Sequence, residues 1–399
     1  MRKASMRTYS ATTEQGEITS YTDRKRWLWL LSLTTPLFPL VGVVAHLATG
    51  NEYWLFLPLS LMFVLGPLFD WLFGEDENNP PEILVPQLEQ DTYYRVLTYL
   101  TVPLHYLTFL GVAIWVGTQG LSWWGFLALT VATGFADGFA INTGHELGHK
   151  RTKIETWLAK IVLAVPAYGH FWIEHNRGHH RDVATPEDPA SARMGESIYK
   201  FARREIPGAF HRAWMIEHER LCRKGVPVWS LQNEVLQSYI ISVVLQVGLI
   251  AAFGWIMLPF LLIHNFFSWW VLTSANYIEH YGLLREKQDD GKYERCQPHH
   301  SWNANHKYSN LLLFHLQRHS DHHANPTRRY QSLRHFPNLP SLPSGYYGMY
   351  IIAYFPWLWF KVLDKRLLAL PHVNGDLGKV NIDPEAKDRL LAKYGVQNG

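Results

Sequence analysis

The sequence predicts an all-α integral membrane protein with six transmembrane helices, arranged as three hairpins beneath a cytoplasmic cap. Only 18% of the 399 residues are charged and 14% are aromatic, a balance typical of a membrane protein with a substantial aqueous part. Lysine and arginine are absent from residues 27–94, 96–149 and 225–284, and each stretch has room for two spans of about 20 residues. Histidines gather in three short clusters outside the apolar runs, so we expect the cap to carry a histidine-rich di-metal site.

The first 26 residues are polar and have neither the apolar core nor the cleavage site of a signal peptide. We therefore expect residues 1–26 to form a cytoplasmic N-terminal arm and the first span to act as an uncleaved insertion signal. Apolar runs at 27–48 and 53–73 form the first hairpin around Gly50, and the second run ends in an acidic, proline-containing loop.

The second hairpin is predicted from residues 95–117 and 121–142, so that the first two hairpins occupy residues 27–149. We expect its second helix to deliver His145 and His149 just beyond its cytoplasmic end. These histidines would then lie at the membrane surface.

The remaining chain divides into an insertion, a third hairpin and a tail. Residues 150–235 are predicted to form the cytoplasmic cap insertion, residues 236–283 the third hairpin, and residues 284–399 a cytoplasmic C-terminal region. Within this region, residues 345–363 are apolar enough for a seventh span. Because Pro356 interrupts that run and tyrosines favour an interface, we expect the segment to lie at the membrane surface.

Charge and cysteine content exclude several classes of protein. The basic residues lie in the segments that flank the hairpins, which the positive-inside rule places in the cytoplasm together with both termini. The net charge of +3 is too small, without a recognition motif, to indicate nucleic acid binding. Cys222 and Cys296 belong to no C-x-x-C pair, so neither a disulfide nor a thiolate metal site is predicted.

Three clusters, which we call the histidine boxes, place imidazoles at helical spacing. The segments are H-E-L-G-H, E-H-N-R-G-H-H-R and Q-R-H-S-D-H-H, and each puts two or more rings near one helix face, where they can bind one metal or two neighbouring metals. A further histidine ends the last predicted span at the same depth. The predicted ligands are His145, His149, His175, His179, His180, His280, His319, His322 and His323.

Ligand chemistry leaves the metal open. H-E-L-G-H satisfies the H-E-x-x-H pattern of zinc proteases, in which the glutamate is the general base. A single zinc with three protein ligands would leave two clusters unused, which favours a two-metal centre. An all-imidazole environment suits zinc, copper, nickel or iron.

Four blocks carry a family resemblance. N-T-G-H-E-L-G-H-K, E-H-N-R-G-H-H-R-D-V-A-T-P-E-D-P-A, N-Y-I-E-H-Y-G and L-Q-R-H-S-D-H-H-A resemble the signature blocks of the integral-membrane alkane 1-monooxygenases. The similarity extends from about residue 25 to 370 and includes G-E-D-E-N-N-P-P-E after the second span. Asp137, inside a span, is no part of these blocks.

The resemblance implies a reaction and its partners. It implies a non-haem di-iron centre that activates O2, takes two electrons from a separate rubredoxin served by a rubredoxin reductase, and hydroxylates the terminal carbon of medium-chain linear alkanes taken from the bilayer. The implied location is the bacterial inner membrane, with the active site on its cytoplasmic side.

Further residues are assigned around this centre. Acids beside the boxes would orient the ring N–H groups and offset the charge of the irons; they are Glu146, Asp182, Asp188, Glu279 and Asp321. Basic residues of the cytoplasmic segments would contact rubredoxin, although positive-inside topology explains each of them equally well; they are Lys150, Arg151, Lys153, Arg203, Arg204, Arg328 and Arg329.

One face of the second span is assigned to a substrate channel. Met62, Gly66, Phe69 and Phe73 follow helical spacing toward the metal end, which taken alone also fits ordinary helix packing. The resemblance favours the channel, with Met62 as the residue that limits chain length.

Other functions remain open at this point. A membrane fatty-acyl desaturase or hydroxylase would use similar histidine boxes on acyl chains. A membrane zinc metalloprotease would need one zinc and no O2, and a metal transporter would need ligands along a permeation path, which no predicted span supplies. Metal stoichiometry together with O2 consumption separates these possibilities.

Overall fold

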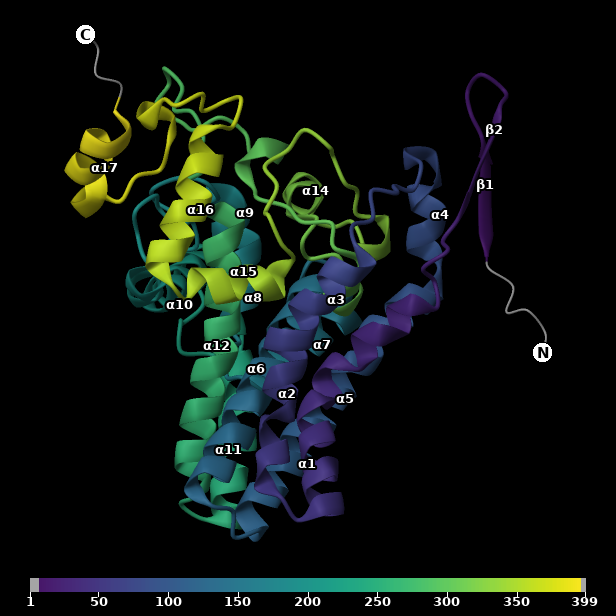
Figure 1. Ribbon diagram of the computed structural model, residues 1–399, viewed down its shortest axis with the longest axis vertical. Helices are drawn as coiled ribbons and strands as arrows, with labels where there is room; N and C mark the ends of the chain where they lie inside the picture. The colour runs from purple at the N-terminus through teal and green to yellow at the C-terminus, as the bar shows by residue number, and fades with distance from the viewer. Residues whose placement is uncertain (1–6, 396–399) are drawn as a thin grey trace.

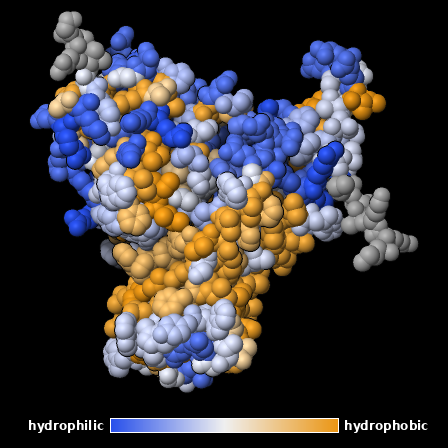
Figure 2. All heavy atoms as spheres, in the orientation of Figure 1, coloured by the Kyte–Doolittle hydropathy of each residue, from blue (hydrophilic) through white to orange (hydrophobic). Residues whose placement is uncertain are grey.

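The computed structural model describes residues 7–395, which are mainly helical and include one small two-stranded sheet. Long apolar helices form a bundle at one end of the molecule, and shorter helices and loops form a head at the other (Figure 1). Figure 2 shows an apolar band across the visible face of the bundle, between the polar head and a small polar tip. This distribution is that of a multi-pass membrane protein.

Among residues 7–395, six helices are long and apolar enough to cross a membrane, which confirms the predicted number of spans. They are Leu28–Thr49, Glu52–Phe73, α5 (Thr92–Thr118), α6 (Trp123–Gly148), α11 (Glu234–Phe253) and α12 (Met257–His280). Most predicted boundaries of these spans lie within three residues of the observed ones, but α6 continues beyond its predicted end at residue 142 to Gly148. His145 therefore lies on the last turns of the span, and only His149 follows its end.

The first two spans are irregular helices. Leu28–Thr49 consists of the 3-10 helices η1 (Leu28–Leu33) and η2 (Thr35–Leu37) followed by α1 (Phe38–Thr49). Glu52–Phe73 consists of η3 (Glu52–Phe56), α2 (Leu57–Ser60), the π-helical turn η4 (Leu61–Leu65) and α3 (Gly66–Phe73). A proline stands in the first two positions of α1, α2 and α3, where it lacks the N–H that would continue the preceding helix.

Helix α6 is the centre of the bundle, and 78% of its most apolar stretch is buried. Two glycines let α12 approach it closely. A Cβ at Gly134 would lie 2.7 Å from the carbonyl oxygen of His264, and a Cβ at Gly138 would collide with the side chain of Val271. Small residues allow this backbone approach in membrane bundles.

A polar triad joins three spans inside the bundle. Asp137 of α6 accepts hydrogen bonds from His105 Nδ1 of α5 at 2.8 Å and from His264 Nε2 of α12 at 2.9 Å. All three side chains are buried. Because an unpaired carboxylate is costly at membrane depth, these bonds hold the three helices in register.

The head is assembled from two parts of the chain. The first follows α6 and contains α7 (Lys153–Ala164), α8 (Phe171–Glu174), the π-helical turn η6 (His175–His179), α9 (His180–Asp182) and α10 (Ile198–Arg223). The second follows α12 and contains η7 (Pro298–His300), α13 (Lys307–Leu312), α14 (His319–Ala324), η8 (Tyr330–Ser332), α15 (Tyr346–Ala353), α16 (Pro356–Leu368), η9 (Leu377–Lys379), η10 (Pro384–Ala386) and α17 (Lys387–Tyr394). Residues 345–363 fall in α15 and α16, which meet at Pro356.

The N-terminal arm contains structure that the all-α prediction omits. Strands β1 (Thr8–Thr12) and β2 (Ile18–Thr22) pair antiparallel, with Tyr9 opposite Tyr21. The hairpin packs near η5 (Glu82–Leu84) and α4 (Val85–Gln90). Asp91, which caps α5, accepts hydrogen bonds from the Tyr9 hydroxyl at 2.6 Å and from Arg26 at 2.6 Å. This ion-paired cluster fastens the hairpin to the bundle.

Candidate metal centre

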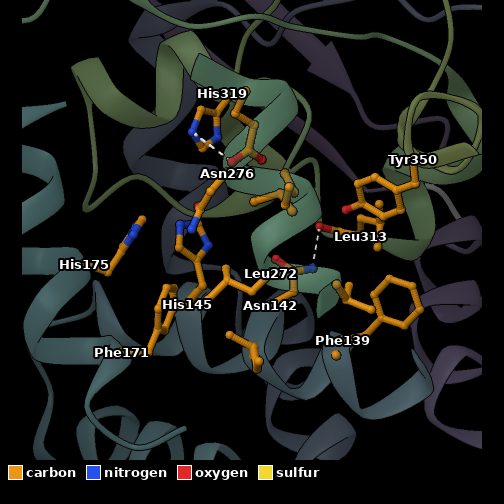
Figure 3. Close-up of a pocket in the computed structure, with 16 residues that line it drawn as sticks. Phe139, Asn142, His145, Phe171, His175, Leu272, Asn276, Leu313, His319 and Tyr350 are labelled. Carbon is orange, nitrogen blue, oxygen red and sulfur yellow. Dashed lines mark hydrogen bonds and ion pairs between the residues drawn. The ribbon is translucent and has the colours of Figure 1, made fainter. Parts of the chain in front are cut away.

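All nine predicted ligand histidines converge where the head meets the bundle. They come from the ends of α6 and α12, from the α8–α9 segment and from α14. Eight are buried and His180 is half-buried. Figure 3 shows three of the rings, His145, His175 and His319, turned toward a common cavity.

Eight of these histidines form two groups, in each of which the ring nitrogens lie within 4.8 Å of one another. The first group is His145, His149, His175 and His322, and the second is His179, His280, His319 and His323.

The shortest nitrogen distances lie within these groups. In the first group, the Nε2 atoms of His145 and His322 are 3.0 Å apart. In the second, His319 Nε2 lies 3.0 Å from His323 Nε2 and 3.1 Å from His280 Nε2. His180 Nε2 lies 3.1 Å from the Nε2 atoms of both His175 and His322, so it adds a fifth nitrogen to the first group. The His180 ring also lies 4.4 Å from the His323 ring, beside the second group.

A π-helical turn divides one histidine box between the two groups. The sequence predicts that His175 and His179 share one face of an α-helix, but residues His175–His179 form a π-helical turn. Their rings stack at 5.1 Å, yet His175 belongs to the first group and His179 to the second. Single π-helical turns occur frequently at functional sites, and here the wider turn lets neighbouring residues serve two positions.

Burial keeps most of the ligand rings neutral. The largest cause is removal from water, and the second is the positive charge that neighbouring rings would carry. Together they lower the pKa of six rings well below the usual value, namely His149, His175, His180, His319, His322 and His323. His179 differs. Burial opposes its charge, but the Asp188 carboxylate outweighs burial and raises the pKa of His179. Neutral imidazoles have a free lone pair, which metal binding requires.

The ring nitrogens of the two groups are arranged to bind metal ions and not to hydrogen-bond with one another. Nε2 of His149 and Nε2 of His179 are buried and have no hydrogen-bond partner in the part of the chain that the structure describes. Converging lone pairs in a dry site are costly unless a cation satisfies them all. Two sets of four or five imidazole nitrogens therefore suit a pair of transition-metal ions, and donor chemistry alone does not choose among zinc, copper, nickel and iron.

Two of the five predicted acids contact ligand rings. Asp188 accepts a hydrogen bond from His179 Nδ1 at 2.9 Å, and Glu279 lies 3.4 Å from His319 Nε2. Burial opposes ionisation of Asp188, but His179 and Arg212 outweigh burial and hold the pKa of the carboxyl below its usual range. An ionised Asp188 fixes the Nδ1–H tautomer of His179, which directs Nε2 into its group.

The other three predicted acids pair with cations instead. Glu146 lies 3.1 Å from Lys150 Nζ, so the glutamate of H-E-x-x-H is held in an ion pair and not directed as the base that a zinc protease needs. Asp321 pairs with Arg328 at 3.0 Å, and Asp182 pairs with Arg181 at 2.8 Å.

Sequence reasoning missed two supports of the centre. The backbone carbonyl of His300 accepts a hydrogen bond from His280 Nδ1 at 3.4 Å, which no side-chain pattern reveals. Glu174 and Arg212 form a buried ion pair, and Arg212 Nη2 also donates to Asp188 at 2.6 Å. Glu174 stands inside the second histidine box, so its position in the sequence was a usable signal.

A narrow cavity of about 30 Å³ adjoins both histidine groups. His145, His175, His319 and Glu279 form its metal end. The rest of its wall is mainly apolar and comes from α6, α8, α12, α15 and the segment before α14; it includes Gly138, Phe139, Ile141, Asn142, Phe171, Val271, Leu272, Ala275, Asn276, Leu313, Leu316 and Tyr350 (Figure 3). Asn142 and Asn276, which stand within the signature blocks, were the available sequence signal for this wall.

Within residues 7–395, the wall of this cavity includes none of the four channel residues predicted on the second span. Met62 is buried in the core cluster that contains Phe139 and Tyr347. Gly66 lies against Tyr347, whose ring is 6.1 Å from that of Phe139. Phe69 packs on Tyr308, and Phe73 is 55% exposed on the outer face.

The cations predicted to contact rubredoxin differ in their exposure and in whether they form ion pairs within the protein. Arg151, Lys153 and Arg203 are exposed. Lys150 is buried against Glu146, and the other three form ion pairs with acids, namely Arg204 with Glu196, Arg328 with Asp321 and Arg329 with Glu155.

Another group of side chains has the composition of a metal site, but the tautomer of its buried histidine does not suit metal binding. Glu294, His299 and His300 lie close together beneath a surface cleft. Nδ1 of His300 accepts a hydrogen bond from the backbone N–H of Gln297 at 2.9 Å, so in the neutral ring Nε2 carries the proton. That N–H faces Glu294 at 3.3 Å, which makes the pair a polar contact and leaves His300 without a lone pair for a metal.

Comparisons with known proteins agree with this geometry. The family model described as fatty acid desaturase matches residues 121–354. Alkane 1-monooxygenase 1 of Alcanivorax borkumensis is 58% identical over 378 residues, which cover 94% of this chain and 93% of the relative.

Two further relatives are similar over the same extent. The alkane 1-monooxygenases of Ectopseudomonas oleovorans and Pseudomonas putida are each 56% identical, over 95% and 94% of this chain and over 94% and 92% of their own lengths.

Proposed function

Because the chain belongs to the alkane 1-monooxygenases, membrane oxidoreductases of the fatty acid desaturase family, we propose that it hydroxylates medium-chain linear alkanes at the terminal carbon. The observation that carries this proposal is the apolar cavity that adjoins both groups of histidines. An alkane offers no polar handle, so its recognition rests on shape and on exclusion of water, and the cavity wall supplies both.

The proposed cofactor is a pair of non-haem irons. The first group together with His180 would hold one ion, and the second group would hold the other. The chemistry that bound irons would supply is activation of O2 for insertion of one oxygen atom into a C–H bond. The overall change consumes the alkane, O2, two electrons and two protons, and it yields a 1-alkanol and water.

The side chains of this protein prepare that chemistry. Asp188 and the His300 carbonyl fix the ring orientations of His179 and His280 through their Nδ1–H groups. Phe171, Leu272 and the other apolar wall residues keep water from the metal end of the cavity. Glu279, held by the Tyr346 hydroxyl at 2.8 Å, places a carboxylate beside His319.

The substrate is proposed to enter from the bilayer. Each CH2 favours an apolar environment by about 0.8 kcal/mol, so a medium-chain alkane leaves lipid for water only at high cost. Met62, Gly66, Phe69 and Phe73 are proposed to shape the route from behind the wall, since the second span presses on Tyr347 and Tyr347 on Phe139.

Electrons are proposed to come from rubredoxin, which a rubredoxin reductase would reduce. The chain has no C-x-x-C pair and cannot build an iron–sulfur carrier of that type itself. We place the head, both termini and the active site on the cytoplasmic side of the bacterial inner membrane, where the basic segments lie. Arg151, Lys153 and Arg203 are then the docking cations with most freedom to meet an acidic partner.

The test combines metal content with product analysis. Purified protein with rubredoxin, its reductase and NADH should bind two irons per chain and form 1-alkanols from linear alkanes, with O2 consumed. His322→Ala, which removes a nitrogen from the first group, should lose iron and activity together but insert normally. His372→Ala, outside both groups, is the matched control and should behave like the parent.

Two results would contradict the proposal. A protein that acts on fatty-acyl chains and leaves alkanes untouched would be a desaturase or acyl hydroxylase. A His322→Ala variant with two irons and full turnover would remove His322 from the ligand set.

A further inference from the structure

Helix α10 buries a carboxyl group for which the metal centre has no evident use. Glu205 is 1% exposed, and within residues 7–395 no lysine, arginine or histidine lies within ion-pair distance of it. Its neighbour Arg204 turns away and pairs with Glu196 at 2.9 Å. Because an unpaired buried carboxylate is costly, a protein that retains one at this position has a reason beyond packing.

The hydrogen bonds of Glu205 lead to the cavity. The Thr273 hydroxyl donates to Glu205 Oε2 at 2.7 Å, and Asn276 Nδ2 donates to Glu205 Oε1 at 3.2 Å. Both partners lie on α12, and Asn276 forms part of the cavity wall, one turn before His280. Glu205 therefore sits directly behind one of the few polar groups that face the substrate space.

The amide of Asn276 has two ends of the same size but opposite hydrogen-bonding character. When Glu205 is ionised it only accepts, so the Asn276 NH2 must turn toward it and the carbonyl is left for the cavity. When Glu205 is protonated, its O–H can donate to the Asn276 carbonyl, and the NH2 then faces the cavity. We propose that Glu205 is a positioning residue whose protonation state sets which end of the Asn276 amide faces the substrate.

The surroundings of Glu205 allow both states near neutral pH. Burial, followed by Glu174 of α8, raises the pKa of Glu205 to about 7, against the hydrogen bonds from Thr273 and Asn276 and the charge of Arg204. Tyr168, before α8, also faces this carboxyl and has a buried hydroxyl, and α12 contributes no titratable group to the contact. Glu205 is thus protonated below about pH 7 and ionised above it.

A direct test follows the carboxyl itself. Infrared difference spectra of the purified protein, without substrate or electron donor, should contain a protonated-carboxyl C=O band that titrates near pH 7. Glu205→Gln should remove the part of this band that Glu205 contributes, while Glu279, a second buried carboxyl, keeps its own part. Glu217→Gln is the matched control, because Glu217 is buried on the same helix but is held by Arg220, and it should leave the whole band in place. A band of equal intensity in Glu205→Gln and in the parent would overturn the proposal.

A second test uses the affinity of an inhibitor to detect which end of the Asn276 amide faces the cavity. It rests on the proposed alkane hydroxylation. Octan-2-one carries a carbonyl that only accepts hydrogen bonds, so as a competitive inhibitor it should bind roughly threefold to tenfold more tightly below pH 7 than above. In Glu205→Gln the side-chain oxygen accepts from Thr273 and the NH2 donates to Asn276, which mimics the protonated acid. Inhibition should then be tight at every pH.

Thr273→Val keeps the proposal testable if the glutamine variant does not fold. It removes a hydrogen bond to the ionised form, so the midpoint of both titrations should move to higher pH. Equal pH dependence in the parent and in both variants would show that Glu205 does not set the amide. If the infrared titration behaves as expected but no alkane is oxidised, the proposed function fails while the titration of Glu205 stands.

Discussion

Asp188 shows how a single residue directs a ligand at this centre. It binds His179 Nδ1 at 2.9 Å and is itself held by Arg212 and by the Ser191 hydroxyl, so the carboxylate cannot turn away from the ring. Loss of the charge would release the tautomer of His179 and the orientation of its ring.

We expect Asp188→Asn to weaken binding of the second metal by roughly 10- to 100-fold while the first remains bound. Competition with a chelator, followed by metal analysis per chain, measures this change. Asp182→Asn is the control. Asp182 belongs to the same segment but pairs with Arg181, so this variant should keep both metals. Equal retention in the two variants would show that Asp188 does not support His179.

The two cysteines should differ in reactivity. Burial raises the pKa of the Cys296 thiol to about 11, whereas Cys222 is exposed on α10. At pH 8 only about one in a thousand Cys296 side chains is the reactive thiolate, and this fraction grows about tenfold per pH unit until pH 11. Iodoacetamide at pH 8 should therefore label Cys222 first, as peptide mass spectrometry can show. Equal labelling at pH 8 would contradict the burial of Cys296.

At the level of elements, the second span combines irregular helix geometry with a proposed role in substrate length. Its π-helical turn, Leu61–Leu65, carries Met62 toward the core and leaves Val64 62% exposed on the outer face. Bulk added at these two positions therefore enters different environments within one turn.

Met62→Trp should push Tyr347 and Phe139 into the cavity and favour shorter alkanes, and Met62→Ala should admit longer ones. Product profiles across a series of linear alkanes measure the change. Val64→Trp adds the same bulk on the outer face and should leave the profile unchanged. If Met62→Trp, Met62→Ala and the parent give one profile, the second span does not limit chain length.

The elements differed in how far the sequence could predict them. The six spans were predictable because apolar runs without lysine or arginine determine them locally, and the histidine boxes were predictable because ligands repeat at helical spacing. The π-helical turn at His175–His179 was not, because its surroundings come from a remote part of the sequence, as Arg212 of α10 lies against Gly178. The cavity wall at Leu313 and Tyr350 depends on packing between segments remote in sequence.

At the scale of the whole molecule, the polar tip and the head mark opposite sides of the membrane. The connections after α1 and after α5 lie at the end of the bundle away from the head (Figure 1), and they include the exposed Asn51 and Gln119. Exposed cations such as Arg151 and Arg203 lie in the head, and by the positive-inside rule they support our proposal that the head is cytoplasmic.

Reporter tags inserted near residues 51 and 119 should register on the periplasmic side, and a tag near Gly225 should register in the cytoplasm. Paired alkaline phosphatase and fluorescent protein fusions measure this orientation, with full-length expression as the control. Cytoplasmic signal from either tip position would reverse the proposed topology.

The order in which ligands occur along the chain has a consequence for biosynthesis. Both groups of histidines draw members from α14, and the last of them is His323. When the ribosome has translated only as far as residue 300, the first group has three of its four members together with His180, and the second has two. Because α14 follows the last span in the sequence, all six spans are synthesised before either group is complete. Until then the first group and His180 already offer four imidazoles, enough for one zinc ion, and only the synthesis of α14 completes both proposed metal positions.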